Sequence, residues 1–258
     1  MKCNVCKNDS ILLFEEVILN KYKIKYYQCS KCSFIQTETP YWLNEVYSSA
    51  IASLDIGLLN RNLFLSDIIS NIISNYKPKG KYLDYAGGYG LFVRLMRDKG
   101  FDFYWIDKYC ENLFAKGFES SNKYYDLVTA LEVFEHFADP VEEINEIFKY
   151  SNTIIFSTEL SPKNNEEIKN WRYISKESGQ HISFYSYESL KFIANYFNLY
   201  LYSNKKDLHV FSKDQFKSNP FSFNFKEKLI KLNFYLKNRK SLINSDVEFI
   251  REKIKNLK

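Results

Sequence analysis

An α/β fold is predicted by three observations along the chain. Apolar strands alternate with amphipathic helices from about residue 81 to residue 212. A glycine-rich turn, Ala86-Gly87-Gly88-Tyr89-Gly90, joins the first of these strands to a helix, and an acid, Asp107, stands at the end of the next strand. A chain that alternates strand and helix builds a mostly parallel sheet with helices on its faces. We therefore expect a Rossmann-like fold that binds ligands at the carboxyl ends of its strands.

Composition and charge restrict the location more than the function. The 258 residues are 45% hydrophobic, enough for a sizeable core, and suggest roughly two domains. The longest uncharged apolar stretch, Phe192–Tyr202, is shorter than the ~20 residues that cross a bilayer. The first residues lack the apolar segment of a secretion signal, so we expect a cytoplasmic protein with no membrane span. The net charge of +5 fits nucleic acid or an anionic substrate, but a general excess of lysine explains it equally well.

Four of the five cysteines stand in two matching pairs. Cys3-x-x-Cys6 and Cys29-x-x-Cys32 can each aim two thiolates at one point, and two such pairs complete a tetrahedral sulfur site. This doubled spacing favours a metal over disulfides, a redox pair or free thiols. Four thiolates leave no open position, so the predicted zinc is structural and belongs to a zinc ribbon at residues 1–38.

The glycine-rich turn is the predicted binding element. A short apolar strand, Tyr82–Tyr85, precedes it, and apolar residues at helical spacing follow from Leu91. Glycines let the backbone approach a ligand with no Cβ in the way. Asp107 follows Gly88 at about the 20-residue separation of a nucleoside-binding unit, where a carboxylate accepts hydrogen bonds from the ribose. A tight turn with no ligand is the alternative.

The remaining elements follow from hydrophobic periodicity. We expect helices at Tyr41–Asn75, Tyr109–Ala115, Val141–Tyr150 and Tyr187–Tyr196, strands at Phe103–Ile106, Tyr125–Leu131, Asn152–Ser157, Leu199–Ser203 and Leu208–Ser212, and a strand remnant at Lys116–Phe118. The connection over residues 158–186 is long enough to be functional. Residues 213–258 form a basic tail whose apolar stripes predict two helices, packed on the body or on a second subunit of a homodimer.

Carboxylates and imidazoles supply the candidate catalytic groups. The segment Glu132-Val133-Phe134-Glu135-His136 follows a predicted strand, at the sheet edge where ligands bind in such folds. Helix capping and a surface patch are the alternative explanation for this segment. His181 lies in the long connection, whereas His209 lies within the last strand and is expected to be structural.

These features together resemble the class I S-adenosylmethionine (SAM) methyltransferases that carry an N-terminal zinc ribbon. The resemblance is carried by the four cysteines, by Asp55–Leu63, Tyr82–Glu119 and Glu132–His136, and by Gly179–Ser186. The turn is similar to the first motif of this family, hydrophobic-D-x-G-x-G-x-G, except that Ala86 replaces the first glycine. More closely, the chain looks like bacterial members associated with sugar and surface-polysaccharide modification.

The resemblance implies a Rossmann-like, seven-stranded class I methyltransferase sheet. The SAM-binding domain would occupy residues 39–212 and the basic helical extension residues 213–258. The residues implied to bind SAM are Asp84, Ala86, Gly87, Gly88, Gly90, Asp107, Phe118 and Glu132, with Asp107 on the ribose and Phe118 over the adenine. The base that takes the proton from an acceptor hydroxyl would be His181, or His136 with Glu135, since imidazole titrates near neutrality.

The reaction implied is methyl transfer to an oxygen of a small molecule. The expected acceptor is a sugar or a capsule or surface-polysaccharide precursor, including a phosphate or phosphoramidate oxygen. The alternative is an RNA methyltransferase that uses the zinc ribbon, the basic surface and stacking aromatic residues. The basic residues are spread along the chain and no N-P-P-Y or D-P-P-Y sequence is present, so nucleic acid is not the expected partner. A non-catalytic binding module that has kept only the fold is a third reading.

Overall fold

The computed structural model describes residues 1–46, 56–121, 123–222, 240–242, 245–246, 248–249 and 252. The chain forms two compact units, which are Met1–Leu54 with Ala130–Gln215, and Asp55–Thr129 with Phe216–Lys258. We call the first the ribbon unit and the second the turn unit. The division falls within strand β6 (Leu127–Leu131). The predicted domains, 1–38, 39–212 and 213–258, stay a prediction.

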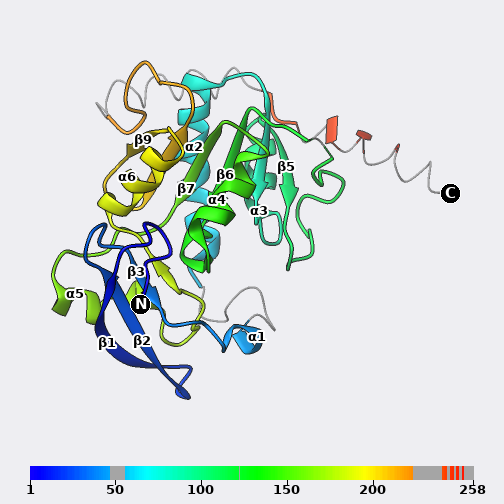
Figure 1. Cartoon of the computed structure of the whole chain (residues 1–258). Helices are drawn as coiled ribbons and strands as arrows, with labels where there is room; N and C mark the ends of the chain where they lie inside the picture. Colours follow the sequence, from blue (N-terminus) through cyan, green and yellow to red (C-terminus); the bar gives the residue numbers. More distant parts are fainter. Residues whose placement is uncertain are drawn as a thin grey trace. The chain divides into compact units, whose positions relative to one another are not determined.

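Parallel strands build the turn unit around the glycine-rich turn. β4 (Lys81–Tyr85) is the central strand, parallel to β5 (Asp102–Ile106) and to β6. Helix α3 (Leu91–Asp98) connects β4 to β5 and packs against β5 and against helix α2 (Leu58–Tyr76). The predicted order of strand, turn, helix and strand is therefore confirmed (Figure 1).

The predicted helix over Tyr41–Asn75 is found only in parts. Within the described residues it comprises α1 (Leu43–Val46), which belongs to the ribbon unit, and α2. The part between them, residues 47–55, lies outside the described residues.

The helix predicted over Tyr109–Ala115 is wrong, because side chains take the backbone amides that a helix would use. Asp107 Oδ1 accepts hydrogen bonds from Tyr109 N at 2.7 Å and from Cys110 N at 2.8 Å. Asn112 Oδ1 accepts one from Ala115 N at 2.9 Å. Asp and Asn side chains commonly hold turns in this way, and these residues form turns here.

The strand remnant predicted at Lys116–Phe118 is reduced to one parallel bridge beside β5, between Trp105 and Glu119. Trp105 N donates to Phe118 O at 2.8 Å, and Ser120 N donates to Trp105 O at 2.7 Å. In the described residues the α/β sheet is mixed and has six strands, which are β4, β5, β6, β7, β9 and β10. The predicted count of seven is therefore not confirmed.

A separate four-stranded sheet joins the amino-terminal ribbon to the end of the long connection. β1 (Ser10–Ile18) and β2 (Tyr22–Cys29) form an antiparallel hairpin, drawn in dark blue in Figure 1. β3 (Ile35–Thr37) pairs with β2 on one side and with β8 (Ser183–Phe184) on the other. The pairing of β3 with β8 was not predicted from the sequence.

Five other elements of the ribbon unit lie close to their predicted bounds, namely α4 (Pro140–Phe148), β7 (Thr153–Ser157), α6 (Tyr187–Tyr196), β9 (Tyr200–Ser203) and β10 (Leu208–Ser212). Three short helices, η1 (Phe134–His136), α5 (Asn165–Lys169) and η2 (Arg172–Ile174), were not predicted. β10 pairs antiparallel with both β7 and β9. α4 begins at Pro140 because Asp139 caps it, accepting from Val141 N and Glu142 N.

One hydrophobic core is shared by the ribbon and the long connection. Its buried members are Ile18, Ile24, Tyr26, Ile35, Trp42, Ile168, Trp171, Ile174, Ile182 and Phe184. Trp42 Nε1 also donates to Gly179 O at 2.8 Å, and Ser186 Oγ donates to Cys32 O at 2.8 Å. The ribbon therefore packs as part of its unit and fixes the path of the connection that carries His181.

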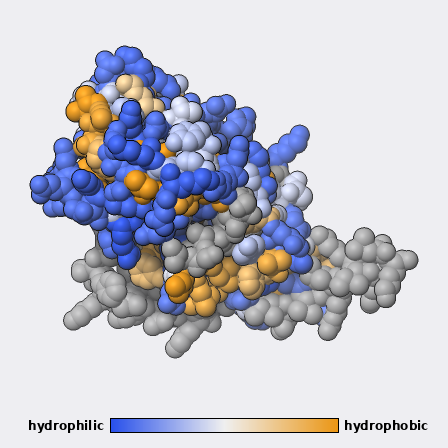
Figure 2. Space-filling view, turned by 90° about the horizontal axis from the view of Figure 1, so that it is seen from below, coloured by the Kyte–Doolittle hydropathy of each residue, from blue (hydrophilic) through white to orange (hydrophobic). Residues whose placement is uncertain are grey.

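The surface carries apolar side chains among mostly hydrophilic ones, as Figure 2 shows in orange and blue. Leu59 and Phe64 of α2 are exposed examples. Within the part of the chain that the structure describes, no helix is long and apolar enough to span a membrane. Most of the predicted helical tail lies outside the described residues.

Candidate functional site

The glycine-rich turn lies so close to the sheet that two of its positions accept only glycine. A Cβ on Gly87 would lie 2.8 Å from Asp84 Oδ2 and 2.9 Å from a ring carbon of Trp105. Gly90 caps the amino end of α3 at φ 83°, and its Cβ would lie 2.6 Å from Asn112 Oδ1. Real Cβ atoms do not approach other atoms this closely, so a side chain at either position would displace the turn.

Ala86 holds the first glycine position of the turn in the left-handed region, at φ 54°. An L-residue there costs roughly 1–2 kcal/mol, because its Cβ crowds the backbone. Ala86 therefore adopts the backbone conformation that glycine would adopt at this position, at the cost of local backbone strain.

Asp107 is placed against the turn, as predicted. Its Oδ2 accepts a hydrogen bond from Gly88 N at 2.9 Å, and its Oδ1 accepts from Tyr109 N and Cys110 N. Apart from its chain neighbours, no atom of the described residues lies within 4 Å of the place that a Gly88 Cβ would occupy, so there is space at the tip of the turn. A carboxylate has about four lone-pair sites. Three of these sites are used by the backbone, and the ribose role of Asp107 stays a prediction.

Asp84 lies beneath the turn and is only 2% exposed. Thr129 Oγ1 donates to its Oδ1 at 2.6 Å. Burial raises the pKa of Asp84 to about 7, the Thr129 hydrogen bond opposes this, and the charge of Asp107 adds to it. Asp84 Oδ2 lies close to the Gly87 backbone, and the predicted role of Asp84 in SAM binding stays a prediction.

Phe118, predicted to cover the adenine, is 6% exposed and packs in a cation–aromatic stack. The Arg97 guanidinium lies 3.7 Å from its ring centroid, and the Phe249 ring stacks on it at 5.6 Å. Arg97 is held by both carboxylate oxygens of Asp246, at 2.9 and 2.8 Å. These side chains border a cavity of about 640 Å³. The adenine role of Phe118 stays a prediction.

In the ribbon unit, the three predicted catalytic residues lie together. A ring nitrogen of His136, a ring nitrogen of His181 and a carboxylate oxygen of Glu135 all lie within 4.8 Å of one another. The two imidazole rings are nearly perpendicular, at 88°, with centroids 5.1 Å apart. The sequence offered His181, or His136 with Glu135, as alternative bases, and the structure brings the two alternatives together.

Main-chain carbonyls orient both imidazoles. His136 Nδ1 lies 3.1 Å from Gln180 O, and His181 Nδ1 lies 2.6 Å from Tyr173 O. A carbonyl only accepts, so each Nδ1 carries the proton and the neutral ring has its lone pair on Nε2. Burial lowers the pKa of His136 to about 4, although the Gln180 and Glu132 carbonyls raise it. His136 is therefore neutral at physiological pH.

Glu132, predicted to bind SAM, is anchored to β7 and has a left-handed backbone, at φ 56°. Ser157 Oγ donates to its Oε1 at 2.6 Å, and Glu132 N donates to Ser157 Oγ at 2.7 Å. The third histidine is structural, as predicted. Its Nδ1 and Nε2 bind Ser203 Oγ at 2.8 Å and Thr158 O at 3.0 Å, and His209 itself is fully buried.

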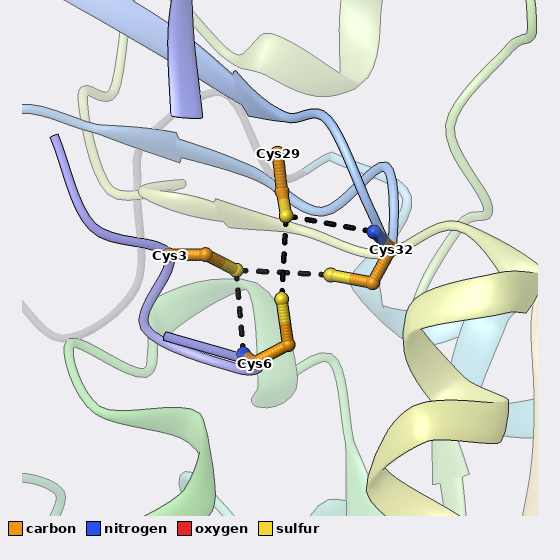
Figure 3. A group of neighbouring side chains, drawn as sticks. All are labelled: Cys3, Cys6, Cys29 and Cys32. Carbon is orange, nitrogen blue, oxygen red and sulfur yellow. Dashed lines mark hydrogen bonds between the residues drawn. The ribbon is translucent and has the colours of Figure 1, made fainter. Parts of the chain in front are cut away.

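The four paired cysteines converge on one point (Figure 3). The sulfur atoms of Cys3 and Cys32 are 3.7 Å apart, and those of Cys6 and Cys29 are 3.3 Å apart. Four sulfurs at about 2.3 Å from a zinc ion would be about 3.8 Å apart. Cys6 N and Cys32 N point at the sulfurs of Cys3 and Cys29, both at 3.5 Å, which favours thiolates. The cluster fits a tetrahedral zinc ion.

The sequence analysis missed residues that hold the candidate site in place. Thr129 donates to Asp84, and Asn112 closes the loop beside Gly90. Tyr173 and Gln180 act through their carbonyls, which any residue type offers, so no side-chain signal could have identified them. Thr129 could have been found, because a hydroxyl in a buried strand needs a partner.

A βαβ crossover with a glycine-rich turn and an acid after its second strand defines a nucleoside-binding α/β protein. A family model described as a methyltransferase domain matches residues 59–204, more than half of the chain. The chain therefore belongs to this family of SAM-dependent class I methyltransferases. A comparison with curated protein sequences found no match.

Solved structures of methyltransferases show only a distant likeness. The plantazolicin methyltransferase BpumL, in complex with a monoazolic desmethylPZN analogue and S-adenosylhomocysteine (SAH), is 13% identical, with a TM-score of 0.43 over 76% of this chain and 87% of that chain. A possible histamine N-methyltransferase from Thermotoga maritima is 13% identical, with a TM-score of 0.43 over 67% and 97%. CalO1, a methyltransferase of calicheamicin biosynthesis, is 12% identical, with a TM-score of 0.44 over 66% and 61%.

Replacing Ala86 by glycine should stabilise the protein. Relief of the left-handed strain gains roughly 1–2 kcal/mol, and the added freedom of the unfolded chain returns roughly 0.4–1 kcal/mol. We expect the free energy of unfolding, measured with urea, to rise by up to about 1 kcal/mol. Ala130, buried in β6, is the control, because Ala130→Gly should destabilise the protein. A loss of stability in Ala86→Gly equal to that in the control would contradict the strain.

The free energy of unfolding should fall as pH rises, through Asp84. The pKa of this group is 3.8 when unperturbed and about 7 in the folded protein. Its contribution is therefore fully present below pH 3.8 and is lost as pH rises through 7. Asp84→Asn should flatten the pH dependence measured by urea unfolding between these values, whereas Asp67→Asn, at an exposed carboxylate, should not. An unchanged slope in Asp84→Asn would refute the assignment.

Proposed function

We propose that this chain transfers a methyl group from SAM to an oxygen of a small molecule. The proposed acceptor is a sugar or a capsule or surface-polysaccharide precursor, including a phosphate or phosphoramidate oxygen. The oriented pair of imidazoles beside Glu135 carries the proposal, because a hydroxyl becomes a good nucleophile only when its proton is removed. The choice of a sugar is supported by the resemblance of the ribbon and of Gly179–Ser186 to sugar-modifying methyltransferases.

The turn unit offers the residues that would hold SAM. Asp107 would bind the ribose, and the open tip at Gly88 would let the backbone approach the ligand. Gly87 and Gly90 keep the turn in place, as does Asp84 beneath it. SAM supplies a methyl group that its sulfonium already activates, so the protein mainly aligns the reactants and excludes water.

The ribbon unit offers the group that would take the proton of the acceptor. His181 holds its proton on Nδ1 against the Tyr173 carbonyl, so Nε2 is the basic nitrogen. His136 is the weaker base, since burial lowers its pKa to about 4. Proton transfer to a positioned base typically contributes 10²–10⁴-fold to the rate.

Binding of SAH tests the cofactor half of the proposal. Calorimetry should detect binding to the purified chain, and Asp107→Asn should weaken it about 10-fold or more, as expected when a charged hydrogen bond is lost. Asp67→Asn is the matched control, because its exposed ion pair with Lys99 is far less costly to remove. Absence of SAH binding by the folded wild-type chain would end the proposal.

Transfer of a labelled methyl group to nucleotide sugars and polysaccharide precursors tests the acceptor half, with RNA as a competing acceptor. His181→Asn should lower kcat about 100-fold or more while leaving the affinity for SAH unchanged. Labelled RNA with unlabelled sugars would instead support the RNA reading.

We further propose that the four cysteines bind a structural zinc ion that positions the histidine cluster through the ribbon. Cys29→Ser should release the zinc, as measured by metal analysis. Amide hydrogen exchange should then speed up in the ribbon and also in residues 180–186, because β8 pairs with β3. Cys110→Ser, at the cysteine outside the cluster, should retain both zinc and protection. Protection of residues 180–186 that survives loss of zinc would contradict this coupling.

A further inference from the structure

The cluster of Glu135, His136 and His181 is built as a rigid unit. Two chain segments supply it, and hydrogen bonds join them, from Ile182 N to Glu135 O at 2.9 Å and from Tyr185 OH to Phe134 O at 3.0 Å. Ser183 Oγ also donates to Phe137 O, at 2.6 Å. The three side chains therefore stay close without depending on one another for position.

Each imidazole of the cluster makes the Nδ1–carbonyl hydrogen bond that is typical of a metal-binding histidine. A histidine that binds a metal usually donates its other ring N–H to a carbonyl or carboxylate, which fixes the tautomer and the ring orientation. His136 and His181 both do so, through the Gln180 and Tyr173 carbonyls. By contrast, His209 uses both of its ring nitrogens, on the Ser203 hydroxyl and the Thr158 carbonyl.

The carboxylate of this cluster lies in the interior, since Glu135 is 0% exposed. Placing a carboxylate so deep is costly unless positive charge or hydrogen bonds compensate it. A cation held between the carboxylate and the two imidazoles would place positive charge beside this buried group.

We infer that Glu135, His136 and His181 form a second metal site, for one divalent transition-metal ion. Their ligand atoms lie within 4.8 Å of one another. Two ligands of one ion bound at 2.0–2.2 Å are at most about 4.4 Å apart, so the ion would draw these side chains slightly together. Two nitrogens and one oxygen suit manganese, iron, cobalt, nickel or zinc, whereas magnesium and calcium prefer all-oxygen ligands. Three protein ligands leave open positions, unlike the four thiolates of the ribbon.

The role of this site in catalysis rests on the proposed function, although the binding of the ion does not. A bound cation lowers the pKa of a coordinated hydroxyl, so it would take over from His181 Nε2 the task of making the acceptor nucleophilic. The proton would then leave to solvent or to an unligated base, and the acceptor oxygen would take the methyl group as its bond to the SAM sulfur breaks.

Titration of the zinc-loaded chain with Mn²⁺, followed by electron paramagnetic resonance, tests the site directly. We expect one Mn²⁺ per chain in addition to the ribbon zinc. Glu135→Gln and His181→Asn should each weaken binding at least about 10-fold, the loss typical even of residues one shell further out. Glu142→Gln removes an exposed carboxylate from the nearby α4 and should bind Mn²⁺ like the wild type.

Two results would overturn the inference. One is a wild-type chain that holds zinc but binds no Mn²⁺ or Co²⁺, and the other is binding that neither Glu135→Gln nor His181→Asn changes. Because His181 is half-buried, its variant remains informative if Glu135→Gln fails to fold. Failure of the proposed function is distinguishable, since it would leave Mn²⁺ binding intact but give no SAH binding or methyl transfer.

Discussion

The short pairing of β3 with β8 is the constraint on which the histidine cluster depends. β8 has only two residues, too few for a strand to be stable by itself. It is held because β3 lies directly after the second cysteine pair and because Phe184, Ile182 and Trp171 share a core with the ribbon hairpin. The second cysteine pair is therefore linked to the segment that carries His181 through the pairing of β3 with β8. A ribbon of this size has little core of its own, so a metal is the natural means of fixing it.

The turn unit depends on a different constraint, the close approach of backbone to sheet. Gly87 lies against Asp84 and Trp105, and Trp105 Nε1 donates to Gly88 O at 2.8 Å. The Asp84 carboxyl group, which leaves no room for a side chain at Gly87, is buried beneath the turn, and burial raises its pKa. Strain at Ala86 is tolerated because these contacts determine the path of the turn more strongly than the preference of one residue.

Much of this arrangement could be predicted from the sequence, because its signals are local. The cysteine spacing, the glycines and the apolar strands each reveal themselves within a few residues, and the strand–turn–helix–strand order followed from them. The failures were of two kinds. The helix expected over Tyr109–Ala115 does not form, because the Asp107 and Asn112 side chains accept hydrogen bonds from backbone amides of this segment. Hydrophobic periodicity does not reveal such hydrogen bonds. The β3–β8 pairing joins segments far apart in the chain and has too few residues to leave a pattern.

The sequence alone does not show which of the three histidines are structural, but their hydrogen bonds and burial distinguish them. His209 is fully buried and uses both ring nitrogens on a hydroxyl and a carbonyl of its own surroundings, so it behaves as a structural residue. His136 and His181 each give one nitrogen to the main chain and converge with a buried carboxylate. An apolar side chain would pack in place of Glu135 at lower cost. A carboxyl group kept in the interior beside two oriented imidazoles is therefore better explained by function than by stability.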